Sequence, residues 1–487
     1  STPEQISQWM QAFGQQSQGP AQVNLWVPDP APLRDPAAET ATPRASGFVT
    51  ALAMDRCRLQ ALRALGAVRE VLDFVCGPTA LQADMLVSSM DGCVEGAYVE
   101  RLSATLGALD LPRFKECWRI VTSRHDALRT YVMADGLGRP LLLCLRDHDP
   151  VWELEDWSHL DASAARTRCE DLLRAIVRSP LDPSVGPPFH WTARKLPGGR
   201  VFLVFSYHHA LLDGWSDGVL LDEAFALYHG RSETTLAPTG SYRDLAAWLV
   251  GRDRDAAREV WNAQLRGLGV DRPWLLTDRD GSGPADSHQE HAAVPDAAVA
   301  AIRGTARRLR IPLSAVLRSA VANAIAEVTG SREVVIGMLS SLRPTELAHV
   351  AQTAGLMLNL VPLRFGCEDV HDPRAAFRRH AALEPHAYLS LDEVRRCAPE
   401  LGVAPLIDTA LVLDFFAAAR SGEGAGFVAH TRGNLPCTIH IRTRGAFGIV
   451  VEHNPAAVSP ECVRKLLDAI VRNLLRTQDA LLQDAST

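Results

Sequence analysis

The sequence predicts a mixed α/β fold of the α+β type, organised as two or three domains. Apolar runs of strand length and apolar residues at helical spacing are both frequent, and they do not alternate strictly along the chain. The chain has 487 residues, which is enough for two or three domains. Its 47% hydrophobic and 22% charged residues are typical of a globular protein.

The first piece of the chain, residues 1–70, has a character of its own. Thr2 can cap a helix whose apolar stripe extends to Phe13, and residues 22–27 alternate in the manner of a short strand. Residues 28–47 are rich in proline and alanine, which predicts an extended or flexible connection. Leucines at helical spacing predict a second helix over residues 49–66.

The rest of the chain is expected to form two larger domains, residues 76–250 and residues 255–487. In the later one, Ser314 can cap an apolar helix that Gly330 ends, and residues 333–337 form the strand that follows. Helices and strands are intermixed in both pieces, which favours α+β packing over a strict βαβ repeat.

The most informative stretch lies at the end of a predicted core strand. The apolar run 201–205 leads into His208 and His209, and Asp213 and Gly214 come next, ahead of an apolar helical pattern. An imidazole can take or give a proton near neutral pH, and a core strand holds it in place. Because side chains alternate along a strand, we expect His208 to point away from His209 and to act as buried support.

This stretch, His-His-x-x-x-Asp-Gly with Trp215 and Ser216 after it, resembles the signature of condensation domains of nonribosomal peptide synthetases. Other segments resemble motifs of the same family in the same order, although Leu342 stands where glycine is usual and Leu360 where threonine is. These segments are residues 77–86, 123–130, 241–248, 336–344, 355–364 and 386–394. The resemblance covers roughly residues 76–480.

The resemblance implies two chloramphenicol-acetyltransferase-like lobes that form a V around a tunnel. It also implies transfer of an acyl chain, held as a phosphopantetheine thioester on a partner carrier protein, to a small amine or alcohol acceptor. Such acyltransferases serve antibiotic and other secondary metabolism. No resident cofactor is expected, because a thioester is already activated and needs no ATP.

The resemblance also assigns roles to the residues of the motif. His209 is the active imidazole, as a base or as a positioning group. Asp213 is a structural acid paired with an arginine, for which Arg129 is the first choice and Arg124 the second. Gly214 either lends a backbone N–H to the oxyanion or permits the turn, and we favour the turn.

Two neighbours of the motif receive structural roles from the residues themselves. Ser216 is expected to be the N-cap of the next helix, and Trp215 to pack in the core. A serine or cysteine in a nucleophile elbow is not visible in the sequence, so we expect direct transfer without an acyl-enzyme.

Composition excludes several other classes of function. The net charge of −7 provides no basic field for nucleic acid, and apolar runs of membrane-spanning length are absent from the sequence. The ten cysteines show no metal-binding spacing, which predicts reduced thiols in a cytoplasmic protein. The sequence also has no glycine-rich nucleotide-binding motif between a predicted strand and a predicted helix.

Alternatives within the same superfamily remain open. A coenzyme-A-dependent acyltransferase of the plant type would carry Asp-Phe-Gly-Trp-Gly, and residues 413–416 do not match it. An epimerase would have x-x-Ser-Trp after the motif's aspartate, where this chain has Gly-Trp-Ser, and a cyclising relative would replace the histidines with aspartates. A non-catalytic recruitment domain would usually lose the second histidine, which is present here as His209.

Residues 1–70 leave two interpretations open. Their pattern resembles the small N-terminal docking domains of assembly-line enzymes, while the alternative is a leader that packs on the catalytic body. Carrier-like and adenylation motifs are not visible in the sequence, so the protein is expected to be either free-standing or part of a larger synthetase, with free-standing favoured.

Overall fold

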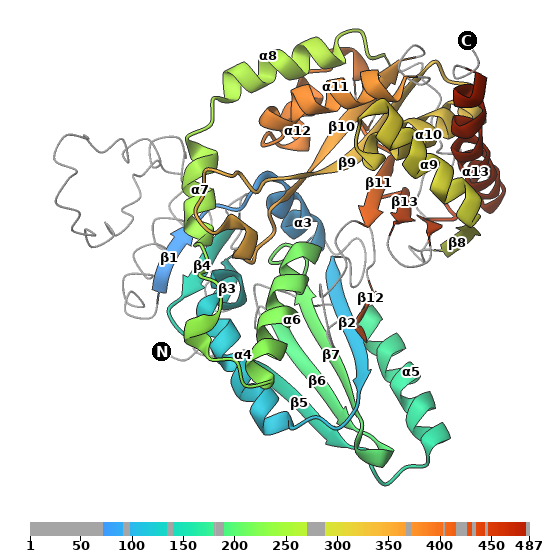
Figure 1. The fold of residues 1–487 in the computed structure, drawn as a ribbon. Coiled ribbons are helices and arrows are strands. Elements are labelled where there is room, and N and C mark those ends of the chain that lie inside the picture. Colours follow the sequence, from blue (N-terminus) through green and yellow to red (C-terminus); the bar gives the residue numbers. More distant parts are fainter. Residues whose placement is uncertain are drawn as a thin grey trace, which may run out of the picture. The chain divides into compact units, whose positions relative to one another are not determined.

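The computed structural model describes residues 72–90, 98–133, 140–179, 181, 189–269, 288–366, 372–402, 405–414, 426–430, 435–443 and 447–483 (Figure 1). The predicted elements within residues 1–70 lie outside this described part. The chain divides into two compact units, and it passes from the first to the second between Arg252 and Asp253. Residues 344–356 and 426–430 group with the first unit, so the lobe expected over 255–487 is not continuous in sequence.

The first unit contains a five-stranded mixed sheet in the order β12-β2-β7-β6-β5 and a three-stranded antiparallel sheet in the order β1-β4-β3. Its strands are β1 (Leu72–Cys76), β2 (Val99–Leu106), β3 (Thr130–Met133), β4 (Leu141–Leu145), β5 (Val151–Asp156), β6 (Phe189–Lys195), β7 (Val201–His208) and β12 (Val428–His430). Its helices are α3 (Ala80–Met90), α4 (Leu111–Arg124), α5 (Ala162–Arg178), α6 (Gly214–Tyr228) and α7 (Tyr242–Val250).

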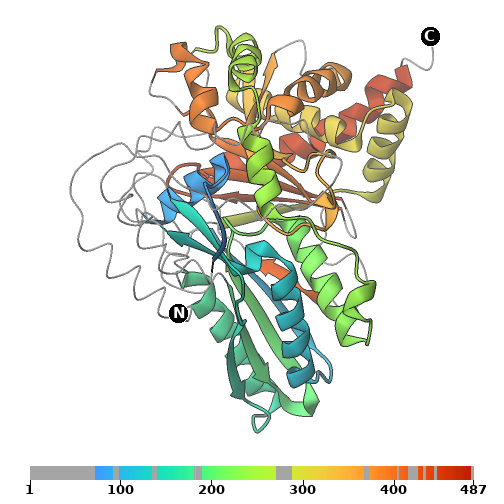
Figure 2. The ribbon, with the colours of Figure 1, turned by 90° about the vertical axis from the view of Figure 1, so that its left-hand side faces the viewer.

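The central strand β7 is apolar along its length because both of its faces are covered. All eight of its residues are buried. Leu203 and Phe205 belong to the core shared with α4 and α6, whereas Phe202 and Val204 pack on the other face with residues of α5. Figure 2 shows the helices along this sheet from the side. The predicted strand over 201–205 is therefore confirmed and extends to His208.

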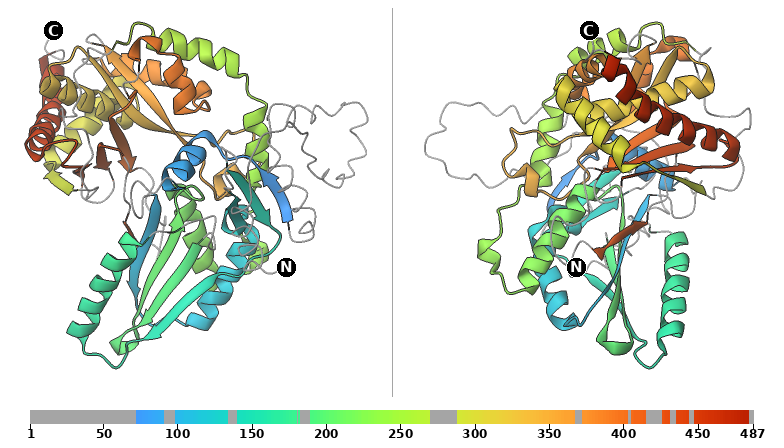
Figure 3. Two further views of the ribbon diagram at one scale, coloured as in Figure 1. Left: turned by 180° about the vertical axis from the view of Figure 1, so that it is seen from behind. Right: turned by 45° about the vertical axis from the view of Figure 1, so that its right-hand side comes forward.

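The second unit contains a six-stranded mixed sheet in the order β10-β9-β11-β13-β14-β8. Its strands are β8 (His288–Ala293), β9 (Glu333–Ser341), β10 (Leu358–Gly366), β11 (Thr409–Asp414), β13 (Cys437–Arg442) and β14 (Gly448–His453). Its helices are α8 (Arg254–Leu265), α9 (Asp296–Leu309), α10 (Leu313–Thr329), α11 (Pro373–Leu383), α12 (Leu391–Arg396) and α13 (Pro460–Gln483). Helices α9, α10 and α13 pack against one another beside this sheet (Figure 3).

Parallel and antiparallel strand pairs occur together in the larger sheets, so the predicted mixed α/β class is confirmed. The predicted helix that ends at Gly330 is α10, and Gly330 has the positive φ of 68° that suits a glycine C-cap. The predicted cap at Ser314 is wrong, because the N-cap is Pro312 and no side chain caps this end.

Among the described helices, none is by itself long and apolar enough to cross a membrane. The consecutive helices α9 and α10, which meet at a bend of 114°, satisfy length and composition only as a pair.

Candidate active site

The two histidines lie where β7 ends and the chain turns toward α6. The turn is held from α3, because the side-chain amide of Gln82 donates to the carbonyl of Ala210 at 2.7 Å. It is also held from the start of β2, because the His209 N–H donates to the carbonyl of Tyr98 at 2.6 Å. Tyr98 itself adopts a positive φ of 57°, an uncommon conformation for a bulky side chain.

His208 is fully buried and hydrogen-bonded at both ring nitrogens. Its Nδ1 accepts from the Ala210 N–H at 3.2 Å, so Nε2 carries the proton of the neutral ring. That Nε2 lies 2.9 Å from the hydroxyl oxygen of Ser89, which in turn donates to the Met85 carbonyl at 2.8 Å. These contacts fit the supporting role expected for His208.

His209 has the opposite arrangement. Its Nδ1 lies 2.8 Å from the carbonyl of Leu212, which can only accept, so Nδ1 carries the proton and Nε2 holds a lone pair. The side chain is 22% exposed, and Nε2 faces the carboxylate of Glu100 at 3.6 Å. The ring is thus oriented by one nitrogen and presents the other as a proton acceptor, which is the geometry of a general base.

Asp213, and not Ser216, is the N-cap of α6. Its carboxylate accepts from the Ser216 N–H at 2.9 Å and from the Ser216 hydroxyl at 2.7 Å. The Ser216 oxygen also accepts from the Gly355 N–H at 2.9 Å, which ties the cap to a segment from the second half of the sequence. The predicted cap role of Ser216 is therefore wrong, because Ser216 lies inside the helix, which begins at Gly214.

The predicted pairing of Asp213 with Arg129 is also wrong. Arg129 is buried and bonds Asp126 at 2.8 Å, with Asp73 at 3.6 Å and the Leu145 carbonyl also in contact. The second choice for the pairing, Arg124, instead bonds Glu223 at 2.9 Å. Both arginines are structural supports, as expected, but for other carboxylates.

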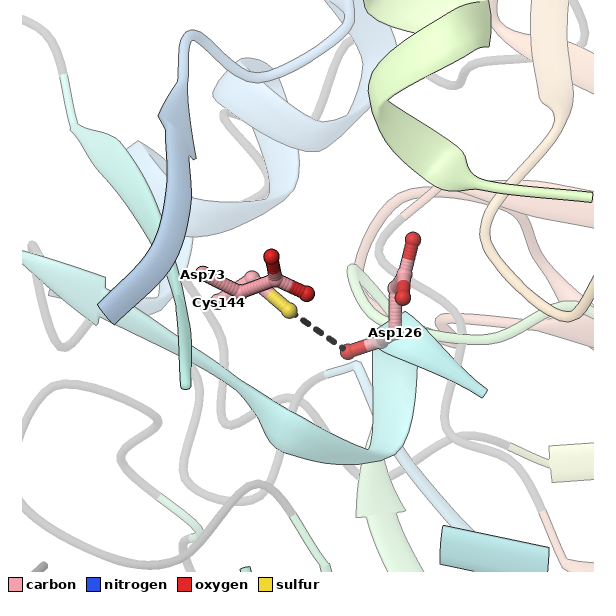
Figure 4. Close-up of side chains that lie close together, drawn as sticks. All are labelled: Asp73, Asp126 and Cys144. Carbon is pink, nitrogen blue, oxygen red and sulfur yellow. Dashed lines mark hydrogen bonds between the residues drawn. The ribbon is translucent and has the colours of Figure 1, made fainter. Parts of the chain in front are cut away.

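A group of potential metal ligands lies beside Arg129. Asp73, Asp126 and Cys144 place potential ligand atoms within 4.8 Å of one another (Figure 4). The Cys144 thiol donates to the backbone carbonyl of Asp126, and burial raises its pKa, which disfavours the thiolate that a metal requires. Arg129 already supplies the cation here, so these residues do not fit a resident metal.

Gly214 is not required by the turn, contrary to the favoured interpretation. It has no positive φ, and a Cβ at this position would meet no atom within 4 Å. Its N–H belongs to the first turn of α6, where N–H groups lack intrahelical partners. Trp215 is half-buried, and its indole N–H donates to the Ala351 carbonyl at 2.8 Å.

Sequence reasoning missed Glu100, which lies beside His209, and Asp217, which interacts with Glu100. Glu100 stands opposite Tyr207 in the pairing of β2 and β7, and the Tyr207 hydroxyl donates to Asp217 at 2.8 Å. Burial raises the pKa of Asp217 well above its usual range, and the charges of Glu100 and Asp213 add to that rise. The available signal was an acidic residue within a strand and a helix whose residues are mostly buried.

Comparison with known proteins identifies the family of this chain. The model of the condensation domain family matches residues 79–487. One of the linear gramicidin synthase proteins of Brevibacillus parabrevis is 30% identical over 292 residues, which are 59% of this chain and 6% of that protein. The chondramide synthase cmdD of Chondromyces crocatus is 28% identical over 330 residues, which are 66% of this chain and 8% of that protein. The match therefore spans only a small part of the length of these relatives.

Solved structures show the same fold. The condensation domain from the monacolin K polyketide synthase MokA superimposes with a TM-score of 0.68 at 17% identity, over 84% of this chain and 98% of that chain. The first condensation domain of the calcium-dependent antibiotic synthetase, solved with a substrate analogue, has a TM-score of 0.66 at 18% identity, over 83% and 97% of the two chains. This chain therefore belongs to the condensation domain family of nonribosomal peptide synthetases, whose members catalyse acyl or peptidyl transfer.

Proposed function

We propose that this protein transfers an acyl chain from the phosphopantetheine thioester of a carrier protein to an amine or alcohol acceptor. The observation that carries the proposal is His209, whose Nδ1 is committed to Leu212 while Nε2 is left as a proton acceptor on a partly exposed ring. General acid–base help from such a group typically contributes about 10²–10⁴ in rate.

The reaction follows from this geometry. His209 Nε2 takes the proton of the acceptor's O–H or N–H as its oxygen or nitrogen attacks the thioester carbonyl carbon. The carbonyl oxygen becomes an oxyanion, for which the Gly214 N–H, at the positive end of α6, is the proposed donor. The carbon–sulfur bond then breaks, and the pantetheine thiolate takes the proton from the imidazolium. The thioester supplies the activation, so neither a metal nor a nucleotide has a step to perform.

The proposed donor requires a partner protein. A carrier protein delivers the thioester, and the acceptor is either free in solution or held by a second carrier. A soluble coenzyme A thioester is the second candidate donor, because the starter condensation domain of rhizomide synthetase was solved with C8-CoA.

The test compares the protein and its His209→Ala variant on acyl-pantetheine thioesters with panels of amines and alcohols, read by mass spectrometry. We expect amide or ester with the unaltered protein and a loss of about 10²-fold or more in the variant. Turnover above half of the unaltered value in His209→Ala would contradict the base role. No product with any donor and acceptor would favour the non-catalytic recruitment domain.

A further inference from the structure

Two hydrogen-bond acceptors face each other at this site. Glu100 Oε1 lies 3.6 Å from His209 Nε2, and the two side chains are 8% and 22% exposed. Because the His209 Nδ1–H is directed at Leu212, Nε2 of the neutral ring cannot donate to Glu100. The pair as it stands is therefore not a hydrogen bond, and it is suited to a donor that both atoms can share.

We propose that Glu100 and His209 bind the reacting nitrogen together, so that Glu100 selects a primary amine, arriving as an ammonium ion, over an alcohol. This inference rests on the proposed acyl transfer and deepens it by naming the acceptor class. An ammonium nitrogen has three N–H groups and no lone pair, so it can donate to both acceptors at once. An alcohol has a single O–H, which satisfies one acceptor and leaves the other facing an oxygen lone pair.

The spacing of the two acceptors fits one nitrogen. Two atoms 3.6 Å apart can both lie about 2.9 Å from a shared donor, with about 77° between the two directions. The N–H bonds of an ammonium diverge by about 109°, so each hydrogen bond bends by about 16° and stays within good geometry.

The protons and bonds balance for this acceptor. The ammonium gives one proton to His209 Nε2 and becomes a neutral amine, and the imidazolium Nε2–H then points at Glu100. His209 passes that proton to solvent. The nitrogen lone pair then forms the new bond to the thioester carbon while Nε2 takes a second proton from nitrogen, the carbon–sulfur bond breaks, and the thiolate takes this proton from the imidazolium. The products are an amide, the pantetheine thiol and one proton that His209 releases to solvent. Glu100 contacts the substrate nitrogen throughout and forms no bond to the acyl group.

The experiment uses acceptors that differ only in the reacting atom. Hexanoyl-pantetheine is the donor, and 2-phenylethylamine and 2-phenylethanol are the acceptors, with kcat/KM measured by mass spectrometry. Glu100→Leu removes the acceptor without presenting an N–H to Nε2, whereas Glu100→Gln keeps the shape and loses the charge. We expect kcat/KM for the amine to fall about tenfold to a hundredfold in both variants. For the alcohol we expect Glu100→Leu to lower kcat/KM less than for the amine, because with an alcohol Glu100 faces only the imidazolium and does not bind the acceptor.

The chain offers a matched control. Glu452 is another buried glutamate that faces a histidine, with its carboxylate 3.9 Å from His440 Nε2, on a strand of the second unit. Glu452→Leu should leave the ratio of amine to alcohol turnover unchanged, and melting temperatures confirm that the variants are folded. Glu100→Asp, which keeps the charge on a shorter arm, should recover part of the preference for the amine.

Binding of the acceptor alone separates this inference from the proposed function. The affinity for 2-phenylethylamine is measured by saturation-transfer NMR on the unaltered protein and on Glu100→Gln, and we expect it to weaken at least tenfold. If the Glu100 variants lost kcat/KM equally for the amine and the alcohol, or lost it for neither, the role of Glu100 would be overturned while acyl transfer stayed intact. Amine binding that depends on Glu100 without any product would support the site and refute acyl transfer with this donor. Neither binding nor product would overturn both.

Discussion

The buried contacts of Arg129 predict a large and specific loss of stability when the guanidinium is removed. Its side chain is 6% exposed and bonds Asp126 at 2.8 Å, with Asp73 at 3.6 Å. The other oxygen of Asp126 accepts from the Ser241 hydroxyl at 2.6 Å and from the Tyr242 N–H at 2.9 Å, so the pair also anchors the start of α7. Arg129→Met keeps most of the volume and leaves the carboxylates without their cation.

Removing one partner of a buried ion pair costs about 3–5 kcal/mol. Asp126 is 12% exposed, and in Arg129→Met it still accepts hydrogen bonds from Ser241 and Tyr242. We therefore expect a loss at the lower end of this range, about 3 kcal/mol. For a unit of this size that loss corresponds to a fall in melting temperature of about 6–12 °C. The assay is calorimetry or circular dichroism on Arg129→Met, Asp126→Asn, Asp213→Asn and the two double variants that contain Arg129→Met.

The double variants decide whether Asp126 or Asp213 is the partner of Arg129. The losses of Arg129→Met and Asp126→Asn should fall short of additivity by about 1 kcal/mol or more, because the second change removes a charge already left alone. The losses of Arg129→Met and Asp213→Asn should add within about 0.5 kcal/mol. Additive losses in the first pair together with non-additive losses in the second would refute the assignment and restore Asp213 as the partner.

Three further results are expected. Deleting residues 1–70 should spare turnover of acyl-pantetheine and slow turnover of carrier-bound donors; equal falls in both, with early melting, would show that this segment packs on the catalytic body. Burial opposes ionisation of Glu393, yet hydrogen bonds from Arg254 and Ser390 lower its pKa to about 2. The stability that this carboxylate contributes is present above its unfolded pKa of about 4.3 and is lost as pH falls toward 2. Glu393→Gln should therefore flatten the dependence of melting temperature on pH between about 5 and 2, and an unchanged slope would contradict that assignment. Exhaustive treatment with EDTA followed by desalting should leave acyl transfer unchanged, and a fall that zinc or magnesium reverses would show a metal requirement.

Local patterns were enough to predict the fold class and the elements around the motif. Strand β7 is visible in the sequence because both of its faces are buried, so its apolar run is nearly continuous. Strand alternation predicts opposite orientations for His208 and His209. The structure ends β7 at His208 and shows that ring buried and the His209 ring partly exposed. The cap of α6 was misplaced because Asp213 and Ser216 are both good capping residues, and sequence preference does not choose between them.

The charged contacts were decided by the tertiary structure alone. Several acidic side chains could in principle pair with Arg129, and only the packing of β1, β4 and the turn before β3 brings Asp73 and Asp126 to it. Glu100 reaches His209 because β2 pairs with β7 in one register, and a shift of one residue would turn Glu100 to the other face of the sheet. The sequence by itself predicted the strand β7 and the position of His209 at its end, since both depend on neighbouring residues. The partners of that imidazole depend on contacts between distant segments, and those exist only in the folded chain.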